Sequence, residues 1–420
     1  MHQIYIGSWM ILEEGTLNKL RPNSPPGGWF PALQGLYLCI TESSFSYADL
    51  FFSPHLKRIH IYVSWSRDSI ALPPGSLQTL ASIVSALPTS SLERISMSTS
   101  NQTMPWTHFK DSLSSVILRC GPSFTEYDAP IPLSNAALNH LIHLPHLRTW
   151  RIHGPPPTYS ASSLPLVFPP LKELSFWKGA TCGWFPLLRR LEDGASTTQG
   201  VTPLSRAKES LKFLRVEDMS GVNVDPSSVS TIQCFRNLVD LRVRVYCPSG
   251  DERGQCIFKL NDDNVAELTM ALTQLEFLVL GHPCSKNTCL TTVACLLPIS
   301  VHCSQLKQLE THFNTANIVD DFRNILEDPR FQQLRSLPKC PLTCLDVYLT
   351  PLRLDESDLE TVAKGMIGIF PSLENCNGFE KGWIKLSEQI MDLQRRARSE
   401  CTLQAIGECS PMFSLRLIHS

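Results

Sequence analysis

The chain has 420 residues, with 37 basic and 39 acidic side chains and a formal net charge of -2. This balance gives no electrostatic reason to expect a nucleic-acid or membrane-surface partner. No stretch reaches the roughly 18 consecutive apolar residues of a transmembrane helix, and the first residues lack a basic start followed by an apolar core. We therefore expect a protein of the cytoplasm, the nucleus or both, with no membrane or nucleic-acid partner.

One short pattern recurs along the whole chain, and we call it the leucine phrase: leucine, two variable residues, leucine, one variable residue and a residue that is usually apolar. Its second half alternates with a period of two, which is typical of a short strand with one face in a core. Such strands are too short to be stable alone, so they must pack against one another as in a leucine-rich repeat solenoid. The copies span residues 33–38, 56–61, 92–97, 113–118, 147–152, 171–176, 211–216, 238–243, 275–280, 306–311, 342–347 and, more weakly, 373–378.

Three of the segments between copies predict helices. Three such segments span residues 133–141, 260–268 and 354–362. In each, the first leucine is followed by Ser, Asn or Asp, placed to accept hydrogen bonds from free helix amides, and then by apolar residues three or four apart. A helical crossover between parallel strands is right-handed. The sequence therefore predicts an α/β fold: a leucine-rich repeat solenoid curved into a horseshoe, with parallel strands on the concave face and helices and loops on the convex face.

The predicted repeats are irregular. Successive copies are about twenty to about forty residues apart, against roughly 20 to 29 for regular arrays. The asparagine that commonly follows the phrase and satisfies backbone groups between turns occurs convincingly only as Asn314, with Thr41, Ser64, Ser100 and Thr350 as weaker substitutes.

A solenoid grows along one axis, so the number of domains cannot be predicted from the length of the chain. We predict a lead-in or cap over residues 1–28, the solenoid over residues 29–380, and a capping helix and tail over residues 381–420. Residues 383–398 carry the apolar spacing of a helix, and terminal repeats need a polar cover. A helix that binds a partner is the alternative interpretation of this last segment.

The 15 cysteines are odd in number and scattered, and several fall at core positions, as do Cys39, Cys120 and Cys376. This distribution indicates reduced, structural thiols. Neither the Cys340 and Cys344 pair nor the densest patch has paired ligands at the short spacing of a zinc site, so we expect no metal. That patch comprises His282, Cys284, Cys289, Cys295, His302 and Cys303.

No catalytic motif occurs in the sequence: there is no phosphate-binding glycine loop, no serine elbow and no helical histidine pair with a glutamate. His140, His143 and His146 are spaced by three and can share a helical face, but no acid or cysteine lies near them in the sequence. Surface residues beside core leucines are the simpler interpretation. We expect no catalytic residue, no cofactor and no enzymatic activity.

The variable strand positions of such a repeat face the hollow of the horseshoe, and many are basic here. Lys57, His60 and Lys212 occupy such positions. Acids are interleaved at Glu93, Glu173 and Asp240, and they dominate later at Glu276, Glu310 and Asp346. A hollow graded from basic to acidic can steer a partner with an acidic segment; an ordinary solvated charged face is the alternative. The candidate partner-binding residues of the concave face are Arg58, Arg94, Arg148, Arg151, Lys172, Arg215, Arg242 and Arg244.

The chain resembles the leucine-rich region of F-box proteins of mushroom-forming (basidiomycete) fungi. The resemblance is carried by residues 30–42, 49–56, 87–92, 133–147 and 168–174, and it extends over about residues 29–380. It implies a repeat region that presents a substrate, and an F-box that docks on the adaptor of an SCF-type ubiquitin ligase. An F-box opens with a Leu-Pro pair and a helix-forming stretch, and residues 1–21 contain neither.

The sequence thus predicts a protein-interaction module that binds an unknown protein substrate. The resemblance implies the substrate-recognition part of an F-box-type receptor, with the SCF adaptor and cullin as partners if an F-box lies upstream. A repeat-only scaffold or adaptor protein without a ligase link is the alternative.

Overall fold

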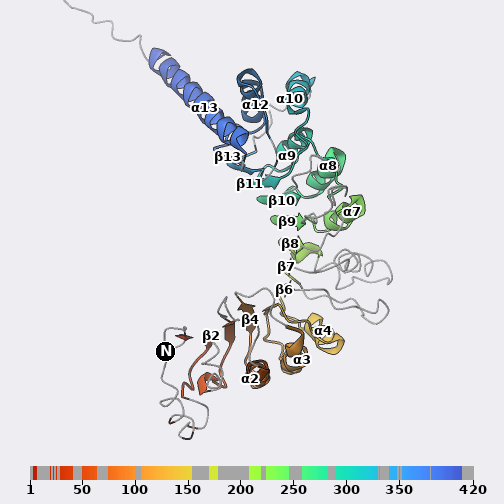
Figure 1. Ribbon diagram of the computed structural model, residues 1–420, viewed down its shortest axis with the longest axis vertical. Coiled ribbons are helices and arrows are strands. Elements are labelled where there is room, and N and C mark those ends of the chain that lie inside the picture. Colours follow the sequence, from red (N-terminus) through yellow and green to blue (C-terminus); the bar gives the residue numbers. More distant parts are fainter. Residues whose placement is uncertain are drawn as a thin grey trace, which may run out of the picture. The chain divides into compact units, whose positions relative to one another are not determined.

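A computed structural model of the chain divides into two compact units (Figure 1). Unit 1 comprises residues 1–222 with 230–245, and unit 2 comprises residues 223–229 with 246–420. The structure describes residues 3–6, 19, 22, 25, 29–40, 50–63, 74–99, 106–153, 170–177, 208–218, 224–245, 258–281, 289–329, 331, 340–347, 350, 352–378 and 380–408.

Unit 1 is a row of parallel strands that pair in chain order, with helices in the connections. Figure 1 shows α2, α3 and α4 together on one side of the strands. The described elements are β1 (Gln3–Ile6), β2 (Gly35–Ile40), β3 (Arg58–Val63), α2 (Pro74–Ser85), β4 (Arg94–Thr99), η3 (Trp106–Phe109), α3 (Lys110–Arg119), β5 (Glu126–Ala129), α4 (Asn135–Ile142), β6 (Thr149–His153), β7 (Glu173–Trp177), β8 (Phe213–Asp218) and β9 (Asp240–Val245).

Unit 2 repeats the same alternation, and its strands β10 to β13 are also parallel and in chain order. The helix α7 (Pro226–Gln233) includes residues of both units. The remaining elements are α8 (Asp262–Ala271), β10 (Phe277–Gly281), η4 (Val293–Cys295), α9 (Leu296–His302), β11 (Gln308–Thr311), α10 (Ile318–Glu327), β12 (Cys344–Asp346), α12 (Glu356–Ile369), β13 (Asn375–Asn377) and α13 (Lys381–Glu408).

The apolar positions of the leucine phrase form the core. In the copy at residues 56–61, Leu56, Ile59 and Ile61 are buried, whereas Arg58 between them is exposed. The same alternation recurs in β2, β5, β8, β12 and β13, because successive strand residues point to opposite faces. In β4 and β7 the serine between the apolar residues, Ser96 or Ser175, is buried as well. The predicted α/β leucine-rich repeat solenoid is therefore confirmed, and its horseshoe curvature stays a prediction. The repeats are irregular: paired residues are 23 positions apart between Gly35 and Arg58 but 40 apart between Glu173 and Phe213.

One predicted strand is wrong. Residues 113–118 lie within α3, where Leu113, Val116 and Ile117 are buried on one helical face and Leu118 is 46% exposed. Their spacing of three and four residues suits a helix, and it outweighs the chance match to the leucine phrase. The strand of this repeat is β5, where Phe124, Tyr127 and Ala129 take the positions of the phrase and are buried.

The three predicted helices are present and begin at the predicted polar residues. Ser134 caps α4 by accepting a hydrogen bond from the amide of Ala137, and Asp355 caps α12 in the same way. Asn261 and Asn264 form a reciprocal capping box at the start of α8. Each cap satisfies an amide that would otherwise lack a partner in the first helical turn.

Hydroxyl groups form many of the links between neighbouring turns, and Asn237 adds one by donating to the carbonyl of Glu209 at 2.7 Å. The Asn314 side chain accepts a hydrogen bond from Ala316 in its own loop, so the predicted link between turns is wrong for this residue. Thr291 donates to the carbonyl of Leu260 in the preceding turn, at 2.8 Å. Other such links come from Ser53, Ser91, Thr99, Thr125, Ser210 and Thr343. Thr41, Ser64 and Ser100 lie outside the described residues.

The two ends of the described chain differ from the leucine phrase. Strand β1 pairs with β2 within the stretch predicted as a lead-in, although it contains no leucine. Helix α13 packs through Trp383, Leu386 and Ile390, all buried, and the indole of Trp383 donates a 2.8 Å hydrogen bond to the carbonyl of Thr350. The helical pattern predicted for residues 383–398 thus forms a helix whose apolar side lies against the last repeat.

In the described part of the chain, no helix has both the length and the hydropathy needed to cross a membrane.

Candidate functional site

The side of the unit 1 strands that faces away from the helices carries rows of side chains, and we call it the strand face. Because the pairing is parallel and in register, equivalent residues of successive strands align in rows across the sheet. The first row contains Gly35, Arg58, Arg94, Glu126, Thr149, Glu173, Phe213 and Asp240. The second row contains Tyr37, His60, Ser96, Asp128, Arg151, Ser175, Arg215 and Arg242.

Arg151 is the centre of an ion-pair network on this face. It donates two hydrogen bonds to Glu173, at 2.8 and 3.0 Å, and one to Asp128 at 3.1 Å. Its Nη1 lies 3.7 Å from Glu126, which also binds Arg94 at 3.1 Å. The hydrogen bonds to Glu173 raise the pKa of Arg151, and burial raises the pKa of Glu126 while both arginines oppose that rise.

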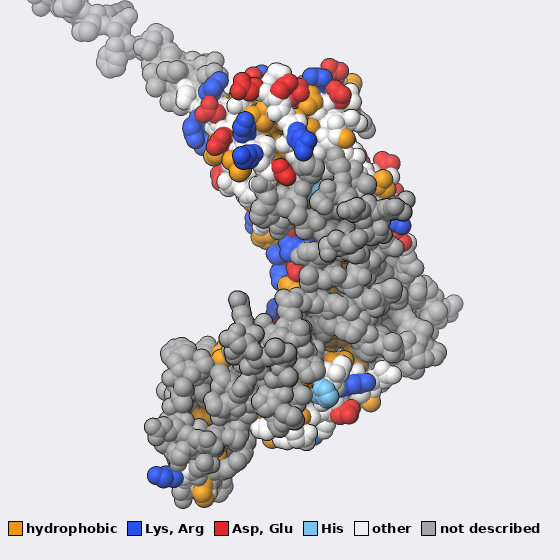
Figure 2. Space-filling view, in the orientation of Figure 1, with side chains coloured by type: hydrophobic (Ala, Val, Ile, Leu, Met, Phe, Trp, Pro, Cys, Tyr) orange, Lys and Arg blue, Asp and Glu red, His pale blue; other side chains and the backbone are white. Residues whose placement is uncertain are grey.

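Asp240 continues the network toward the last strand of unit 1. Its carboxylate is 3% exposed and receives one hydrogen bond from Arg215 and one from Arg242, both at 2.8 Å. On the same strands, Arg244 lies 3.8 Å from Glu217. Blue and red side chains alternate along this part of the molecule in Figure 2. These arginines therefore connect neighbouring turns to one another.

The carboxylates that neutralise the arginines were only partly predicted. Glu173 and Asp240 were recognised in the sequence, whereas Glu126, Asp128 and Glu217 were missed. Glu126 and Asp128 lie on β5, which the leucine phrase does not mark. The Phe124, Tyr127 and Ala129 spacing was the available signal, and it appears only when aromatic residues are allowed in the phrase.

A third row, one residue before the first, has a different character. Backbone hydrogen bonds connect its residues from one turn to the next. These residues are Lys57, Glu93, Thr125, Arg148, Lys172, Lys212 and Val239. Lys57 and Glu93 form an ion pair at 2.9 Å. Arg148, Lys172 and Lys212 lie on three successive turns and are exposed, and no described residue forms an ion pair or side-chain hydrogen bond with them. We call these three residues the cationic edge.

The structure thus divides the eight candidate residues. Six lie on strands of the strand face of unit 1, whereas Arg148 and Lys172 lie in the row that immediately precedes strands β6 and β7. Arg94, Arg151, Arg215, Arg242 and Arg244 have carboxylate partners. Arg58, Arg148 and Lys172 are exposed and lack such partners among the described residues. Their role in binding stays a prediction. Lys212 is likewise exposed and has no carboxylate partner among the described residues.

His60 connects the first strands of the face. Its ring stacks on Tyr37, with centroids 4.6 Å apart, and its two nitrogens lie 2.9 Å from the Ser96 hydroxyl and 3.3 Å from the Ser98 hydroxyl. Ser96 in turn donates to Asp128 at 3.3 Å. Burial lowers the pKa of His60, with Asp128 opposing the shift. Both ring nitrogens are engaged, so the imidazole links β2, β3 and β4.

The cysteine and histidine patch of unit 2 is a set of core thiols. Burial raises the pKa of Cys303 to about 12 and that of Cys340 to about 11, so both are protonated at neutral pH. Cys289 donates to the carbonyl of His312 at 3.5 Å. Among the described residues, no group of three or more His, Cys, Asp or Glu side chains can hold a metal ion; His282 and Cys284 lie outside those residues.

The three spaced histidines of unit 1 have separate surroundings. His140 Nε2 lies 3.0 Å from the carbonyl of Cys120, and His143 Nδ1 lies 2.6 Å from the carbonyl of Asn139. His146 is exposed in the turn before β6.

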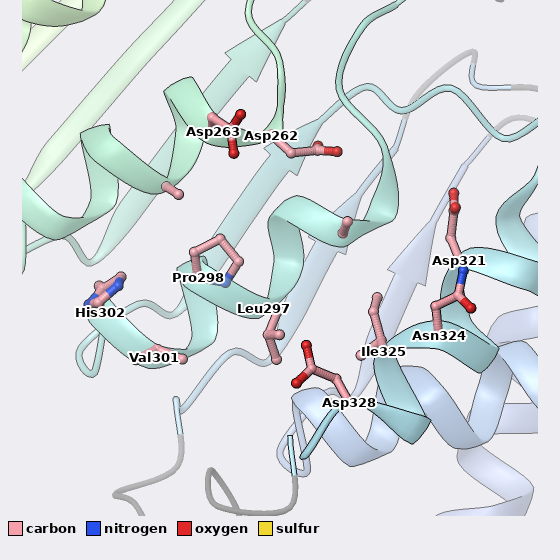
Figure 3. Close-up of a pocket in the computed structure, with 12 residues that line it drawn as sticks. Asp262, Asp263, Leu297, Pro298, Val301, His302, Asp321, Asn324, Ile325 and Asp328 are labelled. Carbon is pink, nitrogen blue, oxygen red and sulfur yellow. The ribbon is translucent and has the colours of Figure 1, made fainter. Parts of the chain in front are cut away.

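A groove of about 590 Å³ lies between the helices α8, α9 and α10 of unit 2. Figure 3 shows an apolar floor that includes Leu297, Pro298 and Val301, with acidic side chains around it. Asp262 at its rim accepts two hydrogen bonds from Thr292, at 2.7 and 2.8 Å, and burial raises the pKa of Asp262. Asp262 therefore connects α8 to η4 as well as lining the groove.

Acidic strand residues of unit 2 have ion-pair or hydrogen-bond partners in the same unit. Glu276 forms an ion pair with Lys307 at 2.6 Å. Asp346 accepts hydrogen bonds from Gln308 at 3.2 Å and Asn377 at 2.8 Å, and Glu310 is buried. In the described part of unit 2, the strand side thus includes amide hydrogen bonds and the ion pair between Glu276 and Lys307.

Comparison with known proteins gives little beyond this geometry. No protein-family model matches the chain. No curated protein matches it either. Among solved structures, the yeast complex of Rad7 and Elc1 contains a similar chain, with 11% identity and a TM-score of 0.40, covering 82% of this chain and 68% of that chain. The class of protein, an α/β solenoid of the leucine-rich repeat type, rests on the strands and the repeats of this chain itself.

Proposed function

We propose that this chain is a protein-interaction module whose strand face in unit 1 binds a protein partner, and that it acts by binding and not by catalysis. One observation carries the proposal: the face away from the helices presents registered rows of side chains, most of them half-buried, on eight paired strands. A rigid, extended surface of this kind suits a macromolecular partner, because its backbone needs no ordering on binding.

The finer proposal follows from the sequence resemblance. The chain is the substrate-recognition part of an F-box-type receptor for an SCF ubiquitin ligase, found in the cytoplasm or the nucleus, with adaptor and cullin as partners through an upstream F-box. A repeat-only scaffold or adaptor protein without a ligase is the second candidate.

Mass spectrometry of proteins that co-purify with the endogenous protein tests both candidates. We expect a reproducible set of protein partners. Recovery of an SCF adaptor and a cullin supports the receptor, and partners without these two proteins support the scaffold. Sequencing the N-terminus of the purified protein in the same experiment shows whether an F-box precedes Met1.

Two matched variants locate the binding surface. Arg58→Glu with Tyr62→Ala changes one exposed cation and one half-buried aromatic on β3. Lys110→Glu with Leu118→Ala makes the corresponding change on α3, at an exposed lysine and at a leucine that is 46% exposed. We expect the β3 variant to lose partners that the α3 variant retains. The proposal fails if both variants, shown to be folded by circular dichroism, capture the same partners as the unchanged protein.

A further inference from the structure

We infer that the cationic edge, Arg148, Lys172 and Lys212, binds an acidic peptide segment of the partner. The inference rests on the proposed function, because it gives the chemistry of the partner that docks on the strand face of unit 1. It also narrows the basic surface predicted from the sequence to three particular residues.

The first step is the contrast in charge pairing. In the network, Arg94, Arg151, Arg215 and Arg242 each have a carboxylate within 3.1 Å. At the cationic edge, three cations lie on neighbouring turns, and no carboxylate of the described residues pairs with them. Like charges on neighbouring strands destabilise a sheet, so this arrangement costs stability unless an anion from elsewhere is bound.

The second step is preorganisation. The amide of Lys172 donates to the carbonyl of Arg148 at 2.8 Å, and the amide of Lys212 donates to the carbonyl of Lys172 at 2.9 Å. Further hydrogen bonds join Arg148 to Thr125 and Val239 to Lys212, both at 2.8 Å. The backbone is therefore occupied and fixed, and only the three cationic side chains are available to a ligand.

The third step is spacing. Neighbouring strands lie about 4.8 Å apart, so the three Cα positions span about 10 Å. In an extended peptide, side chains on one face repeat about every 6.8 Å. Two or three carboxylates or phosphates on alternate residues therefore come within reach of long Arg and Lys side chains. The peptide lies across the strands, along the line of turns.

A peptide fits this line better than a nucleic acid does. The row beside the cationic edge contains the carboxylates of Glu126, Glu173 and Asp240, already paired with arginines of the network. On the three turns of the cationic edge, the described cations without a carboxylate thus form a single line one residue wide, whereas nucleic-acid affinity commonly comes from about six to ten phosphate contacts. The net charge of -2 also opposes a general affinity for polyanions.

The test is fluorescence anisotropy of the full chain with a labelled ten-residue peptide of alternating Glu and Ser. A second probe has the same sequence with phosphorylated serines, and it distinguishes carboxylate from phosphate recognition. We compare the triple variant Arg148→Glu, Lys172→Glu, Lys212→Glu with a control, Lys110→Glu, Lys381→Glu, Lys385→Glu. The control makes the same change in net charge at exposed lysines on helices.

We expect binding of at least one probe to the unchanged protein, weakened about tenfold or more by the triple variant and also by raising the salt from 0.05 to 0.5 M. The control should keep its affinity within about twofold. Equal affinity of both triple variants overturns the inference, as does binding of neither probe, or tighter binding of a ten-residue oligothymidylate than of both peptides. A triple Gln variant replaces the Glu variant if the latter fails to fold.

Lys172→Glu alone separates binding from folding. The new carboxylate lies between Arg148 and Lys212, so we expect the melting temperature to stay the same or rise while peptide affinity falls. A fall in both quantities assigns Lys172 to the fold and contradicts the inference. If partner capture depends on the β3 variant but neither acidic probe binds, the proposed function stands and this inference is wrong.

Discussion

The two units use the same architecture but stabilise their strand sides with different chemistry. In unit 1, arginines and carboxylates on the strand face form a network centred on Arg151 and Asp240. In unit 2, the corresponding positions of β11 to β13 carry Gln308, Asp346 and Asn377, joined by amide hydrogen bonds. Its ion pairs lie mostly on helix surfaces, as between Arg395 and Asp392 in α13.

The difference shows which polar residues belong to the fold. A half-buried arginine needs a carboxylate because leaving its charge unpaired in a partly dry environment is costly. Amides do not require a charged partner, and in the described part of unit 2 amide hydrogen bonds to Asp346 connect β11, β12 and β13. Within unit 1 the same reasoning isolates the cationic edge, because its cations are exposed and the fold does not need them.

The largest effect is expected from a charge in the core. Leu174 is 1% exposed on β7 of unit 1, and Leu309 is fully buried on β11 of unit 2. Leu174→Asp should destabilise unit 1 by several kcal/mol, since an unpaired buried charge is costly by about that order. Hydrogen exchange should show lost protection in β6 to β8, and Leu309→Asp should show it in β10 to β12. Unchanged protection around either substitution would contradict the assigned core.

The next effect compares the ion pairs of the two units. Asp240→Ala leaves Arg215 and Arg242 without their shared carboxylate and should lower the free energy of unfolding by about 3 kcal/mol. Glu276→Ala breaks a pair whose side chains are 31% and 56% exposed, and it should cost at most about 1 kcal/mol. Urea unfolding of both variants measures the difference, and equal losses would remove the distinction between the units.

A smaller effect is expected at glycines. In unit 2, a Cβ at Gly365 of α12 would collide with the ring of Phe322 on α10, so Gly365→Ala should cost about 1–3 kcal/mol despite the better helix propensity of alanine. In unit 1, a Cβ at Gly121 would make an ordinary van der Waals contact with the carbonyl oxygen of Ser90, at 4.0 Å, and Gly121→Ala is the matched control. Thermal unfolding that ranks the two variants the other way would show that the packing of α10 on α12 is wrong.

The smallest effect concerns pH. Burial lowers the pKa of His60 below its ordinary value of 6.5, so the unfolded chain binds more protons in the window just below pH 6.5. Stability contributed by neutral His60 is therefore present above that window and is lost as the pH falls through it. His60→Gln should flatten the dependence of the melting temperature on pH in this range. His302→Gln, at a less buried histidine of unit 2, should flatten it less, and the reverse order would count against the role given to His60.

The sequence by itself determined the repeat and its core, because the leucine phrase records which residues of each strand point inward. It also determined the three polar helix starts at Ser134, Asn261 and Asp355, since capping depends only on residues a few positions apart. It failed at β5, where aromatic residues replace the leucines, and at β1, which has no phrase at all. Local patterns identify an element only when its inward residues are of the expected type.

Only the tertiary structure decided which basic residues are free. In the sequence, Arg148 and Arg151 are three positions apart, carry the same charge and are both predicted to bind a partner. In the fold, Arg151 reaches Glu173 and Asp128, which are 22 and 23 positions away, whereas Arg148 reaches no described carboxylate. Pairing of this kind depends on the register between turns of unequal length, and that register is set by the packing of the whole stack and by no local pattern.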